Sequence, residues 1–123
     1  MKSTYDQSEA YLTKDGSTIR ELMHPDVHGD ELGVQKQSLA EAIVPVGKRT
    51  LLHQHQLTEE LYHITAGEGL MTLGERQFTV QAGDTLCIPP ATAHCIENVG
   101  SVELKILCCC APAYSHQDTE ILE

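Results

Sequence analysis

The sequence has few basic residues and no long hydrophobic segment. Its 123 residues include eight lysines and arginines against eighteen aspartates and glutamates, which gives a formal charge of −10. A surface with this excess of negative charge repels phosphate backbones and anionic lipids, so neither a nucleic acid nor a membrane is expected as a partner. The longest apolar stretch, residues 106–112, falls far short of the roughly 20 residues that a membrane-spanning helix requires.

A secretory signal is not expected, because residues 1–16 contain no apolar stretch of the kind that a signal peptide needs. Five cysteines are present, three of them consecutive at 108–110. Without a secretory signal they are expected to be reduced thiols in a strand, in a cytoplasmic protein. The length and the proportions of 41% hydrophobic and 21% charged residues predict one globular domain, residues 1–123.

Short apolar or β-branched runs recur along the chain, separated by glycine, proline and aspartate every eight to twelve residues. No window sustains the apolar spacing of an amphipathic helix. Asp15-Gly16 and Gly74 each lie between two extended runs and predict hairpins. This arrangement predicts an all-β sandwich or barrel. Residues 23–33, MHPDVHGDELG, are expected to form a loop, and the last eleven residues favour no particular structure.

A histidine-rich stretch, GKRTLLHQHQLTEELYHITAG at residues 47–67, raises the question of a metal site. Strand alternation puts His53 and His55 on one apolar face, which predicts that both imidazoles point inward. Glu60 shares the next strand's apolar face with Tyr62. A carboxylate among apolar neighbours is costly unless it is paired or bound to a metal, and the alternative is a solvated strand end.

A second segment, GDTLCIPPATAHCIEN at residues 83–98, places His94 at the start of another short strand. His94 shares a face with Ile96 and Asn98, so it too is expected to point inward. Taken alone, such a histidine is more often structural. Together with the first cluster it completes three histidines and one glutamate, a nitrogen and oxygen ligand set for a single divalent metal.

These two segments closely resemble the two motifs of the cupin superfamily. The pattern G-x5-H-x-H-x4-E-x6-G matches residues 47–67, and G-x5-P-x-G-x2-H-x3-N matches residues 83–98, with Ala91 where the family usually has glycine. Within the superfamily, the chain is similar to the short single-domain "cupin 2" barrels, whose phosphomannose-isomerase-like label reflects fold and not activity. The matched positions are Gly47, His53, His55, Glu60, Gly67, Gly83, Pro89, His94 and Asn98.

The resemblance implies an all-β double-stranded β-helix, the cupin jelly-roll barrel. It divides the single domain into an N-terminal arm of about residues 1–36, a barrel core of about 37–110 and a C-terminal tail, 111–123. N-terminal arms add strands to a neighbouring barrel in similar cupins, so a homodimer is expected. The resemblance also implies one divalent transition metal per chain, iron, manganese, nickel, zinc or copper, held by His53, His55, Glu60 and His94.

Such a site favours a metal-dependent enzyme that acts on a small oxygen-rich or carboxylated metabolite, as an isomerase, a lyase or decarboxylase, or a dioxygenase. A metal and one carboxylate would leave the site with a charge near +1. The candidate acid or base is Tyr62, for which a packed barrel aromatic is the alternative. The alternative function is a non-catalytic small-molecule-binding or sensing cupin.

Other reactive residues are expected outside this site. Alternation turns Glu59 and His63 to the outer face. Cys108 and Cys110 would share an inner face as small core residues, or line the cavity as thiols. Arg20 is expected in a surface salt bridge, with a substrate anion as the alternative. The histidines in loop or tail sequence are expected to be solvated: His24, His28 and His116.

Overall fold

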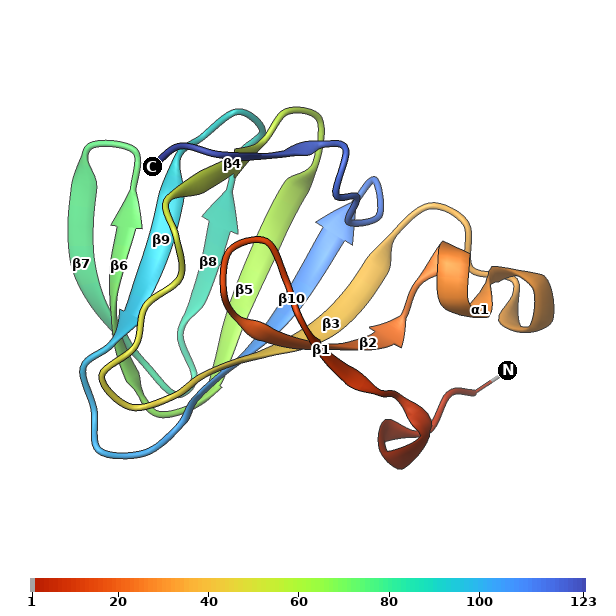
Figure 1. Ribbon diagram of the computed structural model, residues 1–123, viewed down its shortest axis with the longest axis horizontal. Coiled ribbons are helices and arrows are strands. Elements are labelled where there is room, and N and C mark those ends of the chain that lie inside the picture. The colour runs from red at the N-terminus through yellow and green to blue at the C-terminus, as the bar shows by residue number, and fades with distance from the viewer. Residues whose placement is uncertain (1) are drawn as a thin grey trace.

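A computed structural model describes residues 2–123 as two β-sheets that face each other around one core (Figure 1). Two short helices lie in the first third of the chain, the 3-10 helix η1 (Tyr5–Gln7) and α1 (Pro25–Leu32). The strands are β1 (Ala10–Leu12), β2 (Thr18–Met23), β3 (Ser38–Val44), β4 (His53–His55), β5 (Glu59–Ala66), β6 (Glu68–Leu73), β7 (Arg76–Gln81), β8 (Thr85–Ile88), β9 (His94–Asn98), β10 (Leu104–Ala111) and β11 (Thr119–Ile121).

The strand order is that of a jelly roll. One sheet has six strands in the order β1-β2-β3-β10-β5-β8, and the other has five in the order β11-β4-β9-β6-β7. Every pairing within these sheets is antiparallel. Most of the pairings join strands that are not consecutive in the sequence, so each sheet combines segments from both halves of the chain. The all-β double-stranded β-helix is therefore confirmed.

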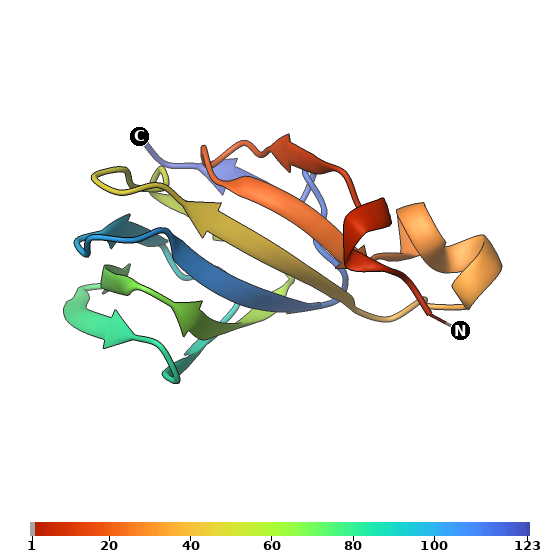
Figure 2. The ribbon, with the colours of Figure 1, turned by 90° about the horizontal axis from the view of Figure 1, so that it is seen from below.

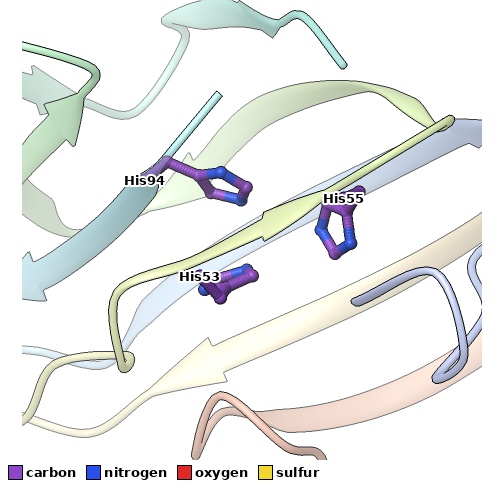
Figure 3. Close-up of side chains that lie close together, drawn as sticks. All are labelled: His53, His55 and His94. Atoms are coloured by element: carbon purple, nitrogen blue, oxygen red, sulfur yellow. The ribbon is translucent and has the colours of Figure 1, made fainter. Parts of the chain in front are cut away.

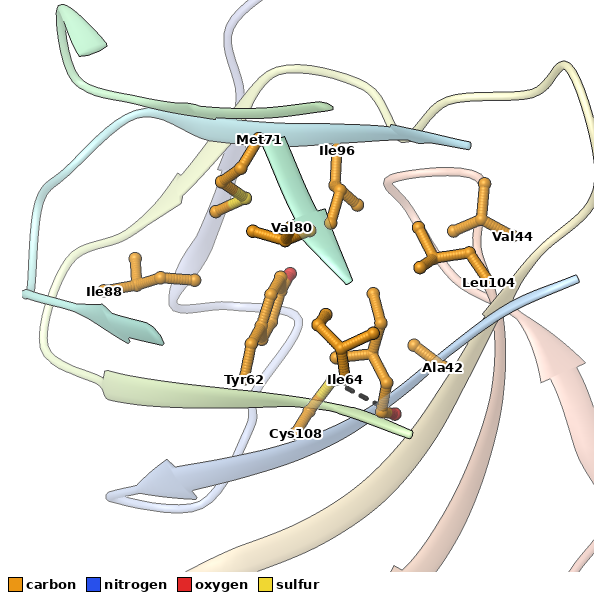
Figure 4. Packing of buried hydrophobic residues seen from close by; sticks show 11 residues of the cluster. Ala42, Val44, Tyr62, Ile64, Met71, Val80, Ile88, Ile96, Leu104 and Cys108 are labelled. Carbon is orange, nitrogen blue, oxygen red and sulfur yellow. Dashed lines mark hydrogen bonds between the residues drawn. The ribbon is translucent and has the colours of Figure 1, made fainter. Parts of the chain in front are cut away.

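The core lies between the inner faces of the two sheets (Figure 4). Exposed and buried side chains alternate almost without exception along β5, and buried and partly buried ones alternate along β10, as period-two strands require. Burial of each large aliphatic side chain contributes roughly 1.5–3 kcal/mol to folding. The buried cluster comprises Ala42, Val44, Tyr62, Ile64, Met71, Val80, Ile88, Ile96, Leu104, Ile106 and Cys108.

Both predicted hairpins are confirmed. β1 pairs with β2 around Asp15-Gly16, and β6 pairs with β7 around Gly74. Gly16 and Gly74 have φ angles of 89° and 60°, which glycine adopts without steric cost. Gly67, between β5 and β6, is needed for a second reason: a Cβ atom there would lie 2.8 Å from the carbonyl oxygen of Glu103.

The expectation of a loop at residues 23–33 is wrong, because α1 occupies most of it. His24 Nδ1 accepts a hydrogen bond from the backbone N–H of Asp26 and caps the helix N-terminus, where proline is tolerated at the first position. Gly33 ends the helix with a φ of 80°. No residue of α1 is buried, so the segment has no apolar stripe by which periodicity could reveal it.

The two ends of the chain pack on the barrel (Figure 2). β2 pairs with β3 of its own barrel, which leaves β1 as an edge strand of the six-stranded sheet. In the tail, β11 pairs with β4, the strand that carries the first two motif histidines. The N-terminal hairpin also meets this part of the chain, because the backbone N–H of Leu51 donates to the carbonyl of Asp15 at 2.7 Å. Within residues 2–123, no helix is long and apolar enough to cross a membrane.

Candidate metal centre

Three histidine side chains from two neighbouring strands converge inside the barrel (Figure 3). His53 and His55 project from β4, and His94 is the first residue of β9, directly opposite His53 in the ladder. All three are buried. The ring centroids of His53 and His94 are 4.2 Å apart, and one ligand nitrogen from each of the three rings lies within 4.8 Å of the other two. The group could hold a metal ion.

Backbone carbonyls fix the ring orientation of two of these histidines. The Nδ1 atoms of His53 and His94 lie 2.7 Å from the carbonyl oxygen of Leu51 and 2.9 Å from that of Thr92. A carbonyl can only accept, so each Nδ1 carries the proton and donates it. Each Nε2 therefore keeps its lone pair, which is the form of imidazole that binds metals.

Thr119 fixes the third ring. Its hydroxyl donates to the carbonyl of Ser115 at 2.8 Å and therefore has only lone pairs to offer His55. His55 Nδ1, 2.8 Å from that hydroxyl oxygen, must then be the donor. All three imidazoles thus present a bare Nε2 to the same space.

Glu60, on the inner face of β5, brings a carboxylate to this group. Its Oε1 lies 3.3 Å from His55 Nε2 and 3.6 Å from His94 Nε2. Burial raises the pKa of this carboxyl, but hydrogen bonds and positive charge from His55 and His94, which these rings supply when protonated, outweigh burial and lower the pKa to about 2. For His53, burial and then the neighbouring His94 lower the pKa, which favours the neutral ligand form.

The carboxylate oxygens and the histidine Nε2 atoms of the site face one another without hydrogen bonds. Glu60 Oε1 and His94 Nε2 are both buried and have no hydrogen-bond partner in the part of the chain that the structure describes. Oδ2 of Asp15, in the β1–β2 turn, lies 3.4 Å from His53 Nε2 in the same way. Lone pairs held this close repel each other unless a cation lies between them. The donor set and its unpartnered atoms therefore fit a bound divalent metal.

The histidines and Glu60 open onto a cavity between the sheets. The space that the centre of a water molecule can reach is about 40 Å³, which is room for roughly three waters. Three carboxylates, those of Asp15, Glu21 and Glu60, line it, and no lysine or arginine among the described residues does. The expected charge near +1 is therefore wrong, because the sequence-based count included Glu60 alone.

Tyr62 lines the same cavity. Its ring is 6.1 Å from the His94 ring, and its hydroxyl points across the barrel toward the sheet that carries Met71 and Val80 (Figure 4). Burial, and then the charge of Glu60, raise the pKa of Tyr62 well above its usual value. The hydroxyl has no hydrogen-bond partner among residues 2–123. It is a protonated donor with nothing in the protein to receive its proton.

Cys108 and Cys110 share the inner face of β10, as strand alternation predicts, and both line the cavity. Cys110 Sγ donates to Glu60 Oε2 at 3.3 Å. Burial, followed by the charge of Glu60, raises the pKa of both thiols well above the ordinary range. Cys108 and Cys110 are therefore small core side chains, and they also line the cavity, so the two roles expected for them do not exclude each other.

The remaining reactive residues lie elsewhere. Glu59 and His63 are on the outer face of β5, where His63 Nδ1 is 2.8 Å from the Thr85 hydroxyl. Arg20 does not reach the cavity but donates to the carbonyls of Tyr5 and Ser8 and stacks on the Tyr5 ring.

Of the three histidines expected in solvent, His24 is buried, and the expectation is wrong for it. Its Nε2 lies 2.7 Å from the carbonyl of Tyr114, and its Nδ1 caps α1. His28 Nδ1 accepts from the His24 backbone N–H, and His116 Nδ1 lies 3.0 Å from the Tyr114 hydroxyl. These histidines hold the arm and the tail in place, and they lie apart from the metal-ligand group.

Sequence reasoning missed four residues that face the site. They belong to the arm and the tail, whose docking on the barrel the motifs do not describe. For Asp15, the only available signal was its position in a hairpin turn. The four residues are Asp15, Glu21, Tyr114 and Thr119.

Comparison with known proteins agrees with this architecture. The family model described as "Cupin domain" matches residues 40–110. An uncharacterized protein of Methanocaldococcus jannaschii, MJ1618, is 61% identical over the whole of this chain and 95% of its own length. The match therefore extends over the arm and the tail as well as the barrel.

Two solved structures share the fold. An oxalate decarboxylase of Lactobacillus farciminis in complex with formate superimposes with a TM-score of 0.80 at 24% identity, over 95% of this chain and 34% of that one. Streptomyces PAC13 with uridine superimposes with a TM-score of 0.76 at 17% identity, over 99% of this chain and 90% of that one. With more than half of its length matched by the family model, the chain belongs to the cupin family.

Proposed function

We propose that the protein is a mononuclear metal-dependent enzyme of the cupin family that acts on a small oxygen-rich metabolite. The ligands would be His53, His55, Glu60 and His94, and residues 1–123 would form one cupin domain. The observation that carries the proposal is the convergence of three buried Nε2 lone pairs on one point, each held by a hydrogen bond at the opposite ring nitrogen.

A divalent iron, manganese, nickel, zinc or copper ion bound there would act as a Lewis acid toward a substrate oxygen, or as a site for O₂. The chain's own groups then have distinct tasks. Tyr62 would donate a hydrogen bond or a proton to the bound molecule, because its raised pKa keeps the hydroxyl protonated. The apolar inner faces of the two sheets would exclude bulk water from the reacting atoms.

A non-catalytic, ligand-binding cupin is the second candidate function. One observation favours it: the Tyr62 hydroxyl points toward the opposite sheet and has no partner among residues 2–123 through which a proton could pass. In this reading, the metal only anchors a small effector. Neighbouring folds solved with formate and with uridine support a small-molecule ligand under either candidate.

The test begins with metal. Protein stripped with a chelator is titrated with Co²⁺, and the ligand-field absorption is followed in the native chain and in His53→Ala, His55→Ala and His94→Ala. Each variant should lose most of its affinity, whereas His63→Ala, whose ring lies on the outside of the same barrel, should bind normally. Tight one-to-one binding in a His53→Ala/His94→Ala double variant would refute the site. A substrate screen in air and without oxygen then separates an enzyme from a binding protein.

The proposal includes a homodimer, because the sheets end in edges that natural proteins cover. β1 is such an edge, and Leu12 on it is exposed. Light scattering should give twice the mass of the chain. A monomer at micromolar concentration would refute the dimer but not the metal site.

A further inference from the structure

The N-terminal hairpin contributes two carboxylates to the cavity beyond the proposed ligand set. Asp15 lies in its turn, and Glu21 lies on β2. They reach the barrel interior because β2 pairs with β3, so the hairpin forms one wall of the cavity. Neither residue belongs to the barrel segment that the cupin motifs span.

The Asp15 carboxylate is held so that one oxygen is structural and the other is free. Oδ1 accepts hydrogen bonds from the hydroxyls of Thr13 and Ser17 and from the Ser17 backbone N–H, at 2.6 to 2.9 Å. Oδ2 faces His53 Nε2 at 3.4 Å. The turn therefore fixes a negative charge beside the nitrogen with which His53 would bind the metal.

Glu21 presents a second free acceptor. Its Oε1 accepts from the Tyr11 hydroxyl at 2.8 Å, while Oε2 is buried and unpartnered in the described part of the chain. The residue is only 8% exposed. A buried carboxylate oxygen without a donor is unfavourable, and a ligand in the cavity with a hydroxyl or amide N–H would satisfy it.

The charges of the cavity restrict what can bind there. A divalent ion with the carboxylates of Asp15, Glu21 and Glu60 carries a net charge of −1, and no basic residue in the described lining offsets it. An anionic ligand would be attracted by the metal but repelled by the carboxylates of Asp15 and Glu21. An uncharged ligand does not meet this repulsion. A cationic ligand would be attracted by the carboxylates but repelled by the metal that its oxygen atoms must approach.

From these charges we infer that the cavity binds a small uncharged hydroxycarbonyl compound and discriminates against carboxylate anions. This inference rests on the proposed metal site. The carbonyl and hydroxyl oxygens bind the metal, and ligand donors reach Asp15 Oδ2 and Glu21 Oε2. The available space, about 40 Å³ for water-molecule centres, corresponds to roughly three waters, so the ligand is small. The hairpin carboxylates thus act as specificity residues.

The test uses two probes of one shape, glycolate, which is an anion, and glycolamide, which is neutral. Each is titrated into the Co²⁺-loaded protein while the ligand-field absorption is followed. Asp15→Asn keeps an oxygen for the turn, and Glu21→Gln keeps an acceptor for Tyr11, so both variants remove charge with little change of shape. Asp84→Asn is the matched control, because Asp84 also caps a turn, at Gln81 N, away from the cavity.

We expect each of the two charge-removing variants to raise glycolate affinity about tenfold while glycolamide affinity stays the same or falls, because one repulsive charge is removed. Asp84→Asn should leave both affinities unchanged. Unchanged glycolate affinity in both Asp15→Asn and Glu21→Gln would overturn the inference while the metal site stood. A native chain that takes up no Co²⁺ would overturn the proposed function and, with it, the inference. Thermal unfolding of each variant checks that the fold is kept.

Discussion

The thiol of Cys110 donates a hydrogen bond to Oε2 of Glu60, with 3.3 Å between the sulfur and the oxygen. The other carboxylate oxygen, Oε1, faces the imidazoles of His55 and His94. Because burial and the charge of Glu60 raise the pKa of this thiol, it stays protonated and can only donate. Cys110 therefore orients the carboxylate that is proposed to bind the metal.

Replacing Cys110 with alanine should weaken Co²⁺ binding by about tenfold, the lower end of what outer hydrogen bonds to metal ligands contribute. Cys110→Ser should keep most of the affinity, because the hydroxyl can donate to the same oxygen. Cys108→Ala is the control, since that thiol lies on the same face but, within residues 2–123, bonds only to the Ile106 carbonyl. Equal losses in the two alanine variants would show that cavity packing, and not the hydrogen bond, is responsible.

Ala91 has a φ angle of 56°, in the left-handed region that costs a side-chain-bearing residue about 1–2 kcal/mol. It stands where the cupin motif usually has glycine. Ala91→Gly should therefore raise the free energy of unfolding by about 1 kcal/mol, after the greater entropy of glycine in the unfolded chain is allowed for. Urea unfolding measures it, and a loss of stability would mean that the Ala91 methyl group contributes packing that outweighs the strain.

The inner face of the site could be predicted from the sequence, because side-chain direction in a strand depends only on a period of two. His53 and His55 on β4, Glu60 on β5 and His94 on β9 all point inward as that period requires. The buried Asn98 of the second motif has a local task that spacing alone does not reveal. Its amide donates to the carbonyls of Val44 and Val102 and closes the turn after β9.

The rest of the site could not be predicted, because it depends on where the two ends of the chain dock. Asp15 and Glu21 face the cavity only because β2 pairs with β3, and Thr119 meets His55 only because β11 pairs with β4. Neither pairing has a sequence signature beyond alternation. Helix α1 buries none of its residues, so only its capping residues could have indicated it.

The Thr119 hydroxyl oxygen accepts a hydrogen bond from His55 Nδ1–H and thereby selects the metal-binding form of that ring. Thr119→Val keeps the shape and removes the acceptor, so the proton can move to Nε2 and compete with the metal. Affinity for Co²⁺ should fall by about 10- to 100-fold, whereas Thr119→Ser should restore it. Thr85→Val is the matched control, because Thr85 makes the equivalent contact to His63 on the outer surface. An unchanged affinity in Thr119→Val would refute the orienting role.

Metal affinity should depend on pH through the histidines and not through Glu60. Protonation of an imidazole removes its lone pair, so affinity is highest above the histidine pKa and falls as the pH decreases through it. Burial and His94 lower the pKa of His53 below 6.5, so half of the Co²⁺ should be released only below pH 6.5. Glu60, with a pKa of about 2, stays ionised throughout this range.

The variant Glu60→Gln tests this division of roles. It should weaken binding by a similar factor at every pH between about 5 and 8, because Glu60 does not change its charge in that range. The measurement is bound Co²⁺ against pH, followed by absorption. A release midpoint above pH 7 in the native chain, or a variant curve of different shape, would contradict the assignment.

Tyr62→Phe separates the two candidate functions. The Tyr62 side chain is buried and its hydroxyl has no partner among residues 2–123, so its removal should leave the free energy of unfolding nearly unchanged. Metal content should also stay the same.

If the hydroxyl of Tyr62 serves as an acid for a bound substrate, turnover should fall by about 10²- to 10⁴-fold with thermal stability kept. If the protein only binds a ligand, affinity should change by no more than the roughly 1–3 kcal/mol of a hydrogen bond. Tyr5→Phe, on the exposed arm, is the control, and full turnover in Tyr62→Phe would rule out the acid role.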